Sequence, residues 1–207
     1  MTSSILIRLG GLAAALGGTV YVGLILVADP YWLERLYYTN TIGYGFVAVL
    51  QPLGAMGAMA AIAALYSSRR SAYWRCEAYF SAVSIVGLSL AVGALTVGVV
   101  LLSYPSDLLV SLILMGLLVA SAGMVLAGGL IMAERVLPWW CGVAIMGGSP
   151  FGMFLMMVPS MALQGSPEGV FWLAKALAAL GGVVWVLVGY AVFQEAGRRP
   201  ERPSRVR

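Results

Sequence analysis

The sequence predicts an all-α membrane protein folded as a bundle of six transmembrane helices. Hydrophobic residues make up 61% of the chain and charged residues 10%, whereas a soluble domain has about half apolar and about a quarter charged residues. The mean hydropathy is +0.95. Six apolar runs in the sequence reach the roughly 20 residues that a helix needs to cross the hydrocarbon of a bilayer.

The six runs follow one another with short connections, so little of the chain is expected outside the bilayer. The first run is too long for the apolar core of a signal peptide and ends in a poor cleavage site, which favours a retained helix. Residues 1–196 are therefore predicted to form one transmembrane domain, and the Arg- and Pro-rich residues 197–207 a disordered cytoplasmic tail. The predicted spans are Ile5–Ala28, Gly43–Tyr66, Tyr79–Leu102, Leu108–Met132, Pro138–Ala162 and Gly169–Val192.

The basic residues predict the orientation of the bundle. Ten of them fall on one side of the predicted membrane and two, Arg35 and Lys175, on the other. Since cytoplasmic loops carry the excess of Lys and Arg, both termini are predicted to be cytoplasmic. An even number of spans requires the same result. The ten residues are Arg8, Arg69, Arg70, Arg75, Arg135, Arg198, Arg199, Arg202, Arg205 and Arg207.

Two predicted spans are interrupted by proline. The second contains Gln51-Pro52-Leu53-Gly54, and the fifth contains Gly147-Gly148-Ser149-Pro150-Phe151-Gly152. Proline removes a backbone donor and frees the carbonyl four residues earlier. In hydrocarbon, such a break persists only where protein groups or water satisfy it.

These segments suggest an internal repeat, because both read polar-Pro-apolar-Gly and occur at matching places in halves 1–103 and 104–196. A fainter match relates the first span to the fourth. Halves of three spans would have opposite orientations, and interrupted helices at matching places point to a midplane binding site. Chance similarity in a chain rich in Gly, Ala, Leu and Met stays open as the alternative. The fainter match pairs Gly11, Leu12, Ala15 and Gly18 with Gly116, Leu117, Ala120 and Gly123.

The candidate ligand-binding residues are Gln51, Pro52, Ser149, Pro150 and Lys175. Gln51 and Ser149 would supply hydrogen bonds, and the prolines would leave backbone carbonyls as further acceptors. Lys175 is the one charge clearly inside a predicted span, which makes it a functional candidate. It could contact an anion, pair with an outer acid or form a Schiff base; alternatively, it reaches the nearby outer surface by snorkelling.

Other chemistries find little support in the sequence. There is no histidine, which removes the commonest general acid or base and the usual imidazole ligand. The two cysteines, Cys76 and Cys141, do not form a metal-binding spacing. No acidic residue lies deep in a predicted span, so a carboxylate proton relay is not expected. We therefore predict no catalytic residue, no metal, no cofactor and no nucleic-acid partner.

Three segments carry a resemblance to uncharacterised bacterial multi-span membrane proteins. They are Leu6–Ala13, Glu134–Trp140 and the end of the last span with Gln194–Arg199. The resemblance implies a bacterial cytoplasmic (inner) membrane location and no particular activity.

The predicted function is non-enzymatic binding or transport of a small uncharged or apolar molecule, through a midplane pocket between the second and fifth spans. An accessory or structural subunit of a membrane complex is the alternative, and a membrane enzyme is the third. The expected partners are the lipid bilayer and a small apolar ligand. A second copy of the chain or a membrane-complex partner stays open.

Overall fold

The computed structural model describes residues 2–27, 41–69, 73–101, 107–150, 152 and 167–197, and within these ranges the ordered elements are all helices. This confirms the all-α class. Five of the helices, α1, α3, α4, α5 and α8, are long and apolar enough to cross a membrane, as expected for a multi-pass membrane protein. The helices are α1 (Thr2–Val27), α3 (Thr41–Arg69), α4 (Trp74–Leu101), α5 (Asp107–Glu134), α6 (Trp139–Gly147) and α8 (Pro167–Gly197).

The helices differ from the predicted spans mainly at their ends. Helix α4 begins at Trp74, before the predicted Tyr79, and α8 continues past Val192 to Gly197. Gly197, expected as the first residue of the tail, thus belongs to a helix, and residues 198–207 lie outside the described ranges.

The fifth predicted span is represented by the short helix α6, which ends at Gly147. Residues 153–162, the rest of that span, lie outside the described ranges. A sixth crossing of the membrane therefore stays a prediction.

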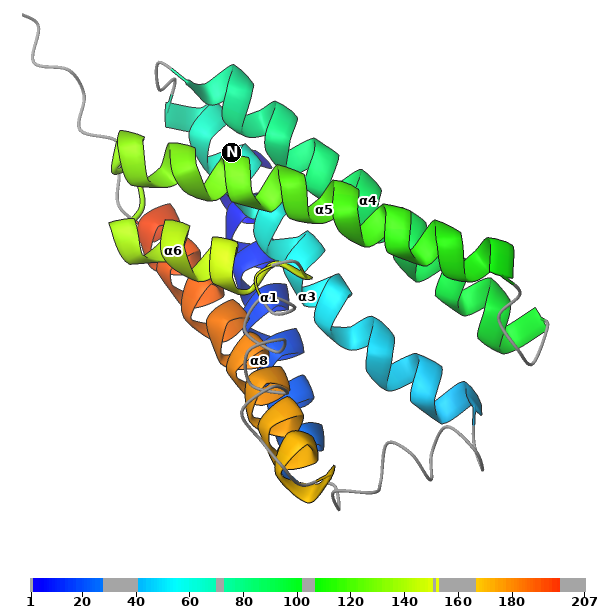
Figure 1. Cartoon of the computed structure of the whole chain (residues 1–207). Coiled ribbons are helices and arrows are strands. Elements are labelled where there is room, and N and C mark those ends of the chain that lie inside the picture. Colours follow the sequence, from blue (N-terminus) through cyan, green and yellow to red (C-terminus); the bar gives the residue numbers. More distant parts are fainter. Residues whose placement is uncertain are drawn as a thin grey trace, which may run out of the picture.

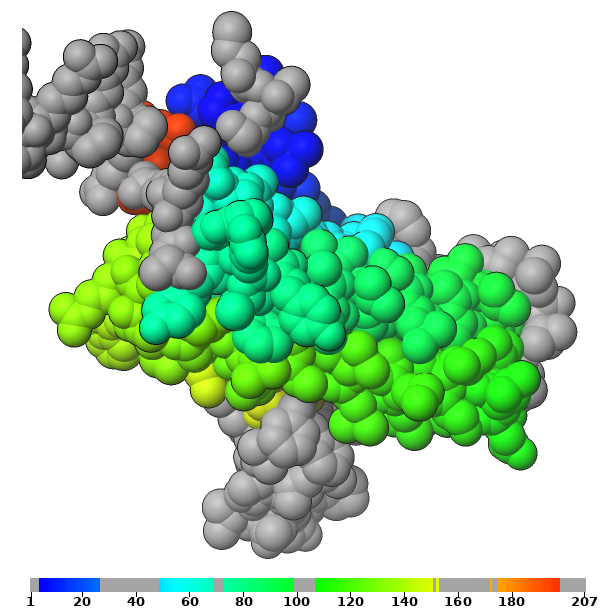
Figure 2. Space-filling view, turned by 90° about the horizontal axis from the view of Figure 1, so that it is seen from above, coloured from blue at the N-terminus to red at the C-terminus, as the bar shows by residue number. Residues whose placement is uncertain are grey.

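The helices are arranged as two close pairs with α3 between them (Figure 1). Helix α1 packs along α8, and α4 packs along α5, while α3 contacts α1, α4 and α8. The short helix α6 contacts α5 and α8. Figure 2 shows the side chains of α4 and α5 lying against each other along the pair. Because α3 contacts members of both pairs, it joins them into one bundle.

Glycines allow α1 and α8 to approach each other closely. A Cβ atom added to Gly11 would lie 2.8 Å from the carbonyl oxygen of Gly189 and 3.1 Å from the backbone nitrogen of Phe193. A Cβ added to Gly18 would lie 2.6 Å from the carbonyl oxygen of Gly182. Both contacts are with backbone, which cannot move aside as a side chain can. Small residues thus let the two helices approach at the distance of backbone contact.

The pair α4–α5 meets in the same way. A Cβ added to Gly116 would lie 2.6 Å from the carbonyl oxygen of Gly87 and 2.7 Å from the backbone nitrogen of Ala91. One added to Gly123 would lie 2.7 Å from the carbonyl oxygen of Phe80. In hydrocarbon, helices associate through such van der Waals contact, because burial of apolar side chains away from lipid gains little.

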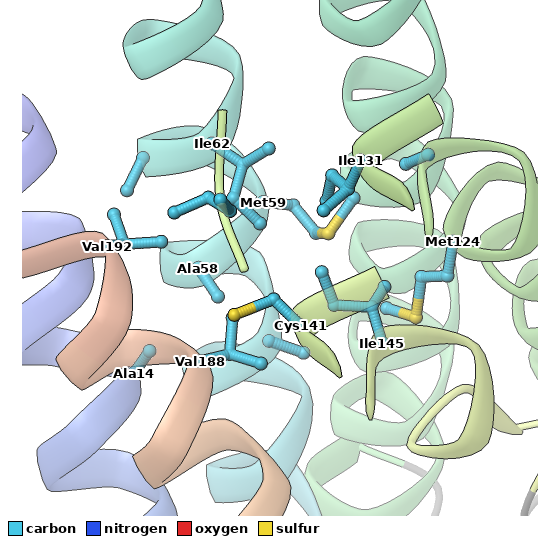
Figure 3. Close-up of a cluster of buried hydrophobic side chains, with 14 of the residues drawn as sticks. Ala14, Ala58, Met59, Ile62, Met124, Ile131, Cys141, Ile145, Val188 and Val192 are labelled. Atoms are coloured by element: carbon cyan, nitrogen blue, oxygen red, sulfur yellow. The ribbon is translucent and has the colours of Figure 1, made fainter. Parts of the chain in front are cut away.

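The core lies where α3, α5, α6 and α8 meet, with α1 at its edge (Figure 3). Large apolar side chains from these helices interlock there, and most of them are fully buried. The labelled members are Ala14, Ala58, Met59, Ile62, Met124, Ile131, Cys141, Ile145, Val188 and Val192. This core holds α6 in place, although the helix has only nine residues.

Candidate functional site

A cavity of about 220 Å³ lies among four of the helices and the segment that follows α6, next to the core. Its walls come from the middle of α3, from α4, α5 and α8, and from the segment that follows α6. The lining residues are Gln51, Pro52, Ala55, Leu88, Leu117, Met124, Gly148, Pro150 and Trp185. The structure thus brings the two proline segments, distant in sequence, to one cavity.

The walls of the cavity are largely apolar. Ala55, Leu88, Met124 and Trp185 are buried, and Trp185 is the largest side chain among them. Gln51, a partly buried residue of α3, supplies an amide. Among the described residues that line the cavity, none carries a charge or an acid–base group. The described walls are therefore suited to contact a small, largely apolar molecule.

The chain turns at the cavity directly after α6. The N–H of Gly148 donates to the carbonyl of Ala144 at 2.7 Å, and the N–H of Ser149 donates to the carbonyl of Met146 at 3.3 Å. The hydroxyl of Ser149 also donates to the Met146 carbonyl at 2.6 Å and accepts from the N–H of Gly152 at 3.1 Å. The break thus satisfies its own backbone groups, as a break in hydrocarbon requires.

Glycine is required at two positions around this turn. A Cβ added to Gly152 would collide with the carbonyl oxygen of Met146, and it would lie 2.7 Å from that of Gly147. A Cβ added to Gly148 would lie 2.8 Å from a methyl carbon of Val184 in α8. The segment packs this tightly against itself and α8 because it lacks side chains at these points.

The prediction that Pro52 interrupts the second span is wrong, because the helix is continuous there. Helix α3 continues through it from Thr41 to Arg69, so the proline lies near the middle of a 29-residue helix. Without an N–H it cannot donate to the carbonyl of Ala48, the acceptor expected in a regular helix. Pro52 lines the cavity, so this carbonyl is close to the cavity wall.

The predicted site residues therefore have different positions. Gln51, Pro52 and Pro150 line the cavity, whereas Ser149 is fully buried beside it with its hydroxyl engaged by Met146 and Gly152. Contact of these residues with a ligand stays a prediction. Lys175 is not among the lining residues; its ammonium lies 5.1 Å from the centroid of the exposed Trp172 ring.

The sequence analysis missed a buried polar cluster at the end of the bundle where α3 ends and α4 begins. Tyr66, Glu77 and Cys141 are each fully buried there, and Tyr66 interacts electrostatically with the other two and with Glu134. Glu77 was expected outside a span because α4 was predicted to begin later, at Tyr79. The polar residues before Tyr79 concealed the true start of the helix at Trp74.

In the described part of the chain, no three His, Cys, Asp or Glu side chains are placed so that they could hold a metal ion together. The chain matches no protein-family model, no curated protein and no solved structure. The resemblance to bacterial multi-span proteins stays a prediction, and the function is argued from the geometry alone.

Proposed function

We propose that the protein binds a small, largely apolar and uncharged molecule in this cavity and carries it across the membrane. The observation that carries the proposal is the convergence of Gln51, Pro52 and Pro150 on one cavity. Irregular backbone at a binding site is typical of transporters. Here the segment after α6 supplies such a break, whereas Pro52 only removes one backbone hydrogen bond from the continuous helix α3.

The proposal includes two inverted halves, each of three spans. Gly11 and Gly18 of α1 meet α8 at Gly189 and Gly182. At the same spacing, Gly116 and Gly123 of α5 meet α4 at Gly87 and Phe80. In each pair the first helix of one half packs on the last helix of the other, as a two-fold relation between the halves requires.

The contacts agree at the level of atoms. The Cβ position of Gly11 faces the carbonyl oxygen of Gly189 and the nitrogen of Phe193, four residues later; that of Gly116 faces the carbonyl oxygen of Gly87 and the nitrogen of Ala91, also four residues later. Gly10 of α1 meets the carbonyl oxygen of Gly57 and the nitrogen of Ala61 in α3 in the same way, so these partner atoms are common to closely packed helices. The support for a repeated unit comes from the shared seven-residue spacing and from the matching order of the paired helices.

The cavity indicates the class of ligand. Its volume of about 220 Å³ exceeds the roughly 150 Å³ of an engineered apolar cavity that binds benzene. The Gln51 amide can donate a hydrogen bond to one polar group of the ligand or accept one from it, and the Trp185 ring can pack against an apolar part of the ligand. A molecule with one small ring and one hydroxyl or carbonyl group meets these conditions, whereas an anion would find no charge to balance its own.

The proposed topology has six crossings of a bacterial cytoplasmic membrane, with both termini cytoplasmic. One end of the bundle supports it, because the Arg8 guanidinium lies 3.9 Å from the Cβ position of Gly197, close to where α8 ends. Arg75 and Arg135 belong to the helix termini at that end. Reporter fusions after Arg75 and after Arg207 should both read as cytoplasmic, and an external signal from either would contradict the topology.

Binding can be tested with 4-bromobenzyl alcohol as probe and tryptophan fluorescence as readout. Bromine quenches indole emission at contact, so the probe should quench the wild type more than Trp185→Phe at equal concentration. Gln51→Leu should weaken binding about tenfold, the loss expected for one hydrogen bond in an apolar site. Gln194→Leu, the matched change at an exposed residue of α8, should leave it unchanged. Equal quenching in all four proteins would contradict the proposal.

Native mass spectrometry of protein extracted gently from its own membrane separates this function from that of an accessory subunit. A monomer or homodimer with a retained small molecule supports binding in the cavity. A fixed complex with another protein and no small molecule would favour the accessory role instead.

A further inference from the structure

The buried cluster at the junction of α3 and α4 contains two polar atoms without a partner. Among the described residues, the phenol oxygen of Tyr66 and the Oε2 oxygen of Glu77 are buried and make no hydrogen bond. Both side chains are 0% exposed. Buried polar atoms nearly always have a partner, so two such atoms in one cluster require an explanation.

The described groups that interact with Tyr66 are acids and a thiol. The other carboxyl oxygen of Glu77, Oε1, accepts a long hydrogen bond of 3.4 Å from Ser81. Around Tyr66 the interacting groups are Glu77, Glu134 and Cys141, none of which is a cation. The nearby guanidinium of Arg75 lies over the Trp74 ring at 5.3 Å, and both residues are exposed. Among the described side chains, none supplies a positive partner for Glu77, and a buried carboxylate in such surroundings is costly.

We propose that Glu77 and Tyr66 bind a small monovalent cation of the Na⁺ type. The two unpartnered oxygens would be ligands, and the Ser81 hydroxyl, which donates to Glu77, keeps lone pairs for the same ion. Carboxylate and hydroxyl oxygens are hard ligands that suit a hard cation. Only one carboxylate would touch the ion, and no three acidic or thiol side chains of the described chain are placed to hold a metal ion together, which favours one positive charge over two.

The position of the site gives it a structural role. It joins the last turn of α3 to the first turn of α4 and faces Cys141 near the start of α6. It shares no residue with the cavity lining. The bound ion would therefore hold α3 and α4 together from outside the cavity, and the proposal does not depend on what the cavity binds.

The test is thermal unfolding of the purified full-length protein in nanodiscs, at fixed pH and equal ionic strength, in NaCl, KCl or choline chloride. Sodium should raise the Tm of the wild type above its value in choline. Above half-saturation, each tenfold increase in NaCl should add about 3 °C. The difference between the Tm in NaCl and the Tm in choline chloride should vanish in Glu77→Gln and shrink in Tyr66→Phe. Asp107→Asn, the matched change of an exposed acid in the first turn of α5, should keep it.

Each comparison is made between salts within one variant, so a general loss of stability does not disturb the result. Saturable binding of radioactive ²²Na⁺ to the wild type, lost in Glu77→Gln, would support the site directly. Equal Tm values in NaCl and choline chloride, without ²²Na⁺ binding, would overturn the proposal. That outcome is expected if a proton, or an arginine outside the described side chains such as Arg70, neutralises Glu77.

Discussion

The two proline segments at the cavity share a sequence pattern and differ in structure. In the first half, α3 passes through Pro52 as a continuous helix, whereas in the second half α6 ends at Gly147, shortly before Pro150. The residues before each proline explain the difference. Leu50 and Gln51 favour helix, whereas Gly147 and Gly148 weaken it. In the second segment, the Ser149 hydroxyl donates to the Met146 carbonyl.

The comparison shows that proline alone does not break a membrane helix. A break also requires residues that give up helix at low cost and a side chain that satisfies the exposed carbonyl. Only the second segment has both. The two halves can thus be related in helix packing while they differ in the backbone at the cavity.

The largest effect is expected where the halves agree. Gly87→Ala and Gly189→Ala should each destabilise the protein by roughly 3 kcal/mol, because the new Cβ meets backbone of the facing helix. Gly93→Ala and Gly129→Ala are the controls, since nothing lies within 4 Å of their Cβ positions. They should be neutral or stabilising by up to about 1 kcal/mol. Thermal unfolding in nanodiscs measures the stability of all four variants. If only one of Gly87→Ala and Gly189→Ala is destabilising, the two helix pairs do not correspond.

The next effect concerns the break itself. Ser149→Ala removes one donor to Met146 and one acceptor for Gly152, so it should cost about 1–3 kcal/mol. Ser111→Ala is the control, because this exposed hydroxyl also donates to a backbone carbonyl, that of Asp107. Its removal should change the free energy of unfolding by no more than about 0.5 kcal/mol. Equal effects of the two changes would show that Ser149 does not hold the break.

A smaller effect of opposite sign is expected in α3. Pro52→Ala returns an N–H that can donate to the carbonyl of Ala48, so it should stabilise the helix by about 1 kcal/mol. Hydrogen exchange should slow around residues 48–52. A loss of stability would mean that the helix relies on the proline, and the contrast between the two segments would lose its basis.

The smallest effect is expected at Lys175. Its contact with Trp172 lies at the surface of α8, and such a cation–π pair contributes about 0.5–1 kcal/mol. Lys175→Gln should therefore change stability by no more than this and leave probe binding unchanged. A strong loss of probe binding would instead support the prediction that Lys175 contributes to ligand binding.

Hydropathy was sufficient to predict the five long helices, because about 20 apolar residues in a row have few other structures open to them. The prolines indicated which parts of the chain line the cavity, although Pro52 turned out to lie within a continuous helix. The end of α6 at Gly147 was harder to predict, because it depends on the Ser149 hydroxyl bonding locally.

The buried cluster could not be predicted for a different reason. Glu77 and Tyr66 lie in ordinary polar surroundings in the sequence, and only the packing of α3, α4 and α6 buries them. The agreement between the helix pairs was also hidden, because Gly182 in one half has Phe80 as its counterpart in the other. The backbone contacts match although the side chains do not.

The contact between α1 and α8 has a consequence for how the protein is made. Helix α1 is synthesised well before α8, the helix that Gly11 and Gly18 face. It can pack on α3 as soon as that helix is inserted, because the two are in contact. The face that carries Gly11 and Gly18 must meet lipid or the insertion machinery until α8 follows. A chain that stops before Pro167 should therefore be inserted but left open to quality-control proteolysis.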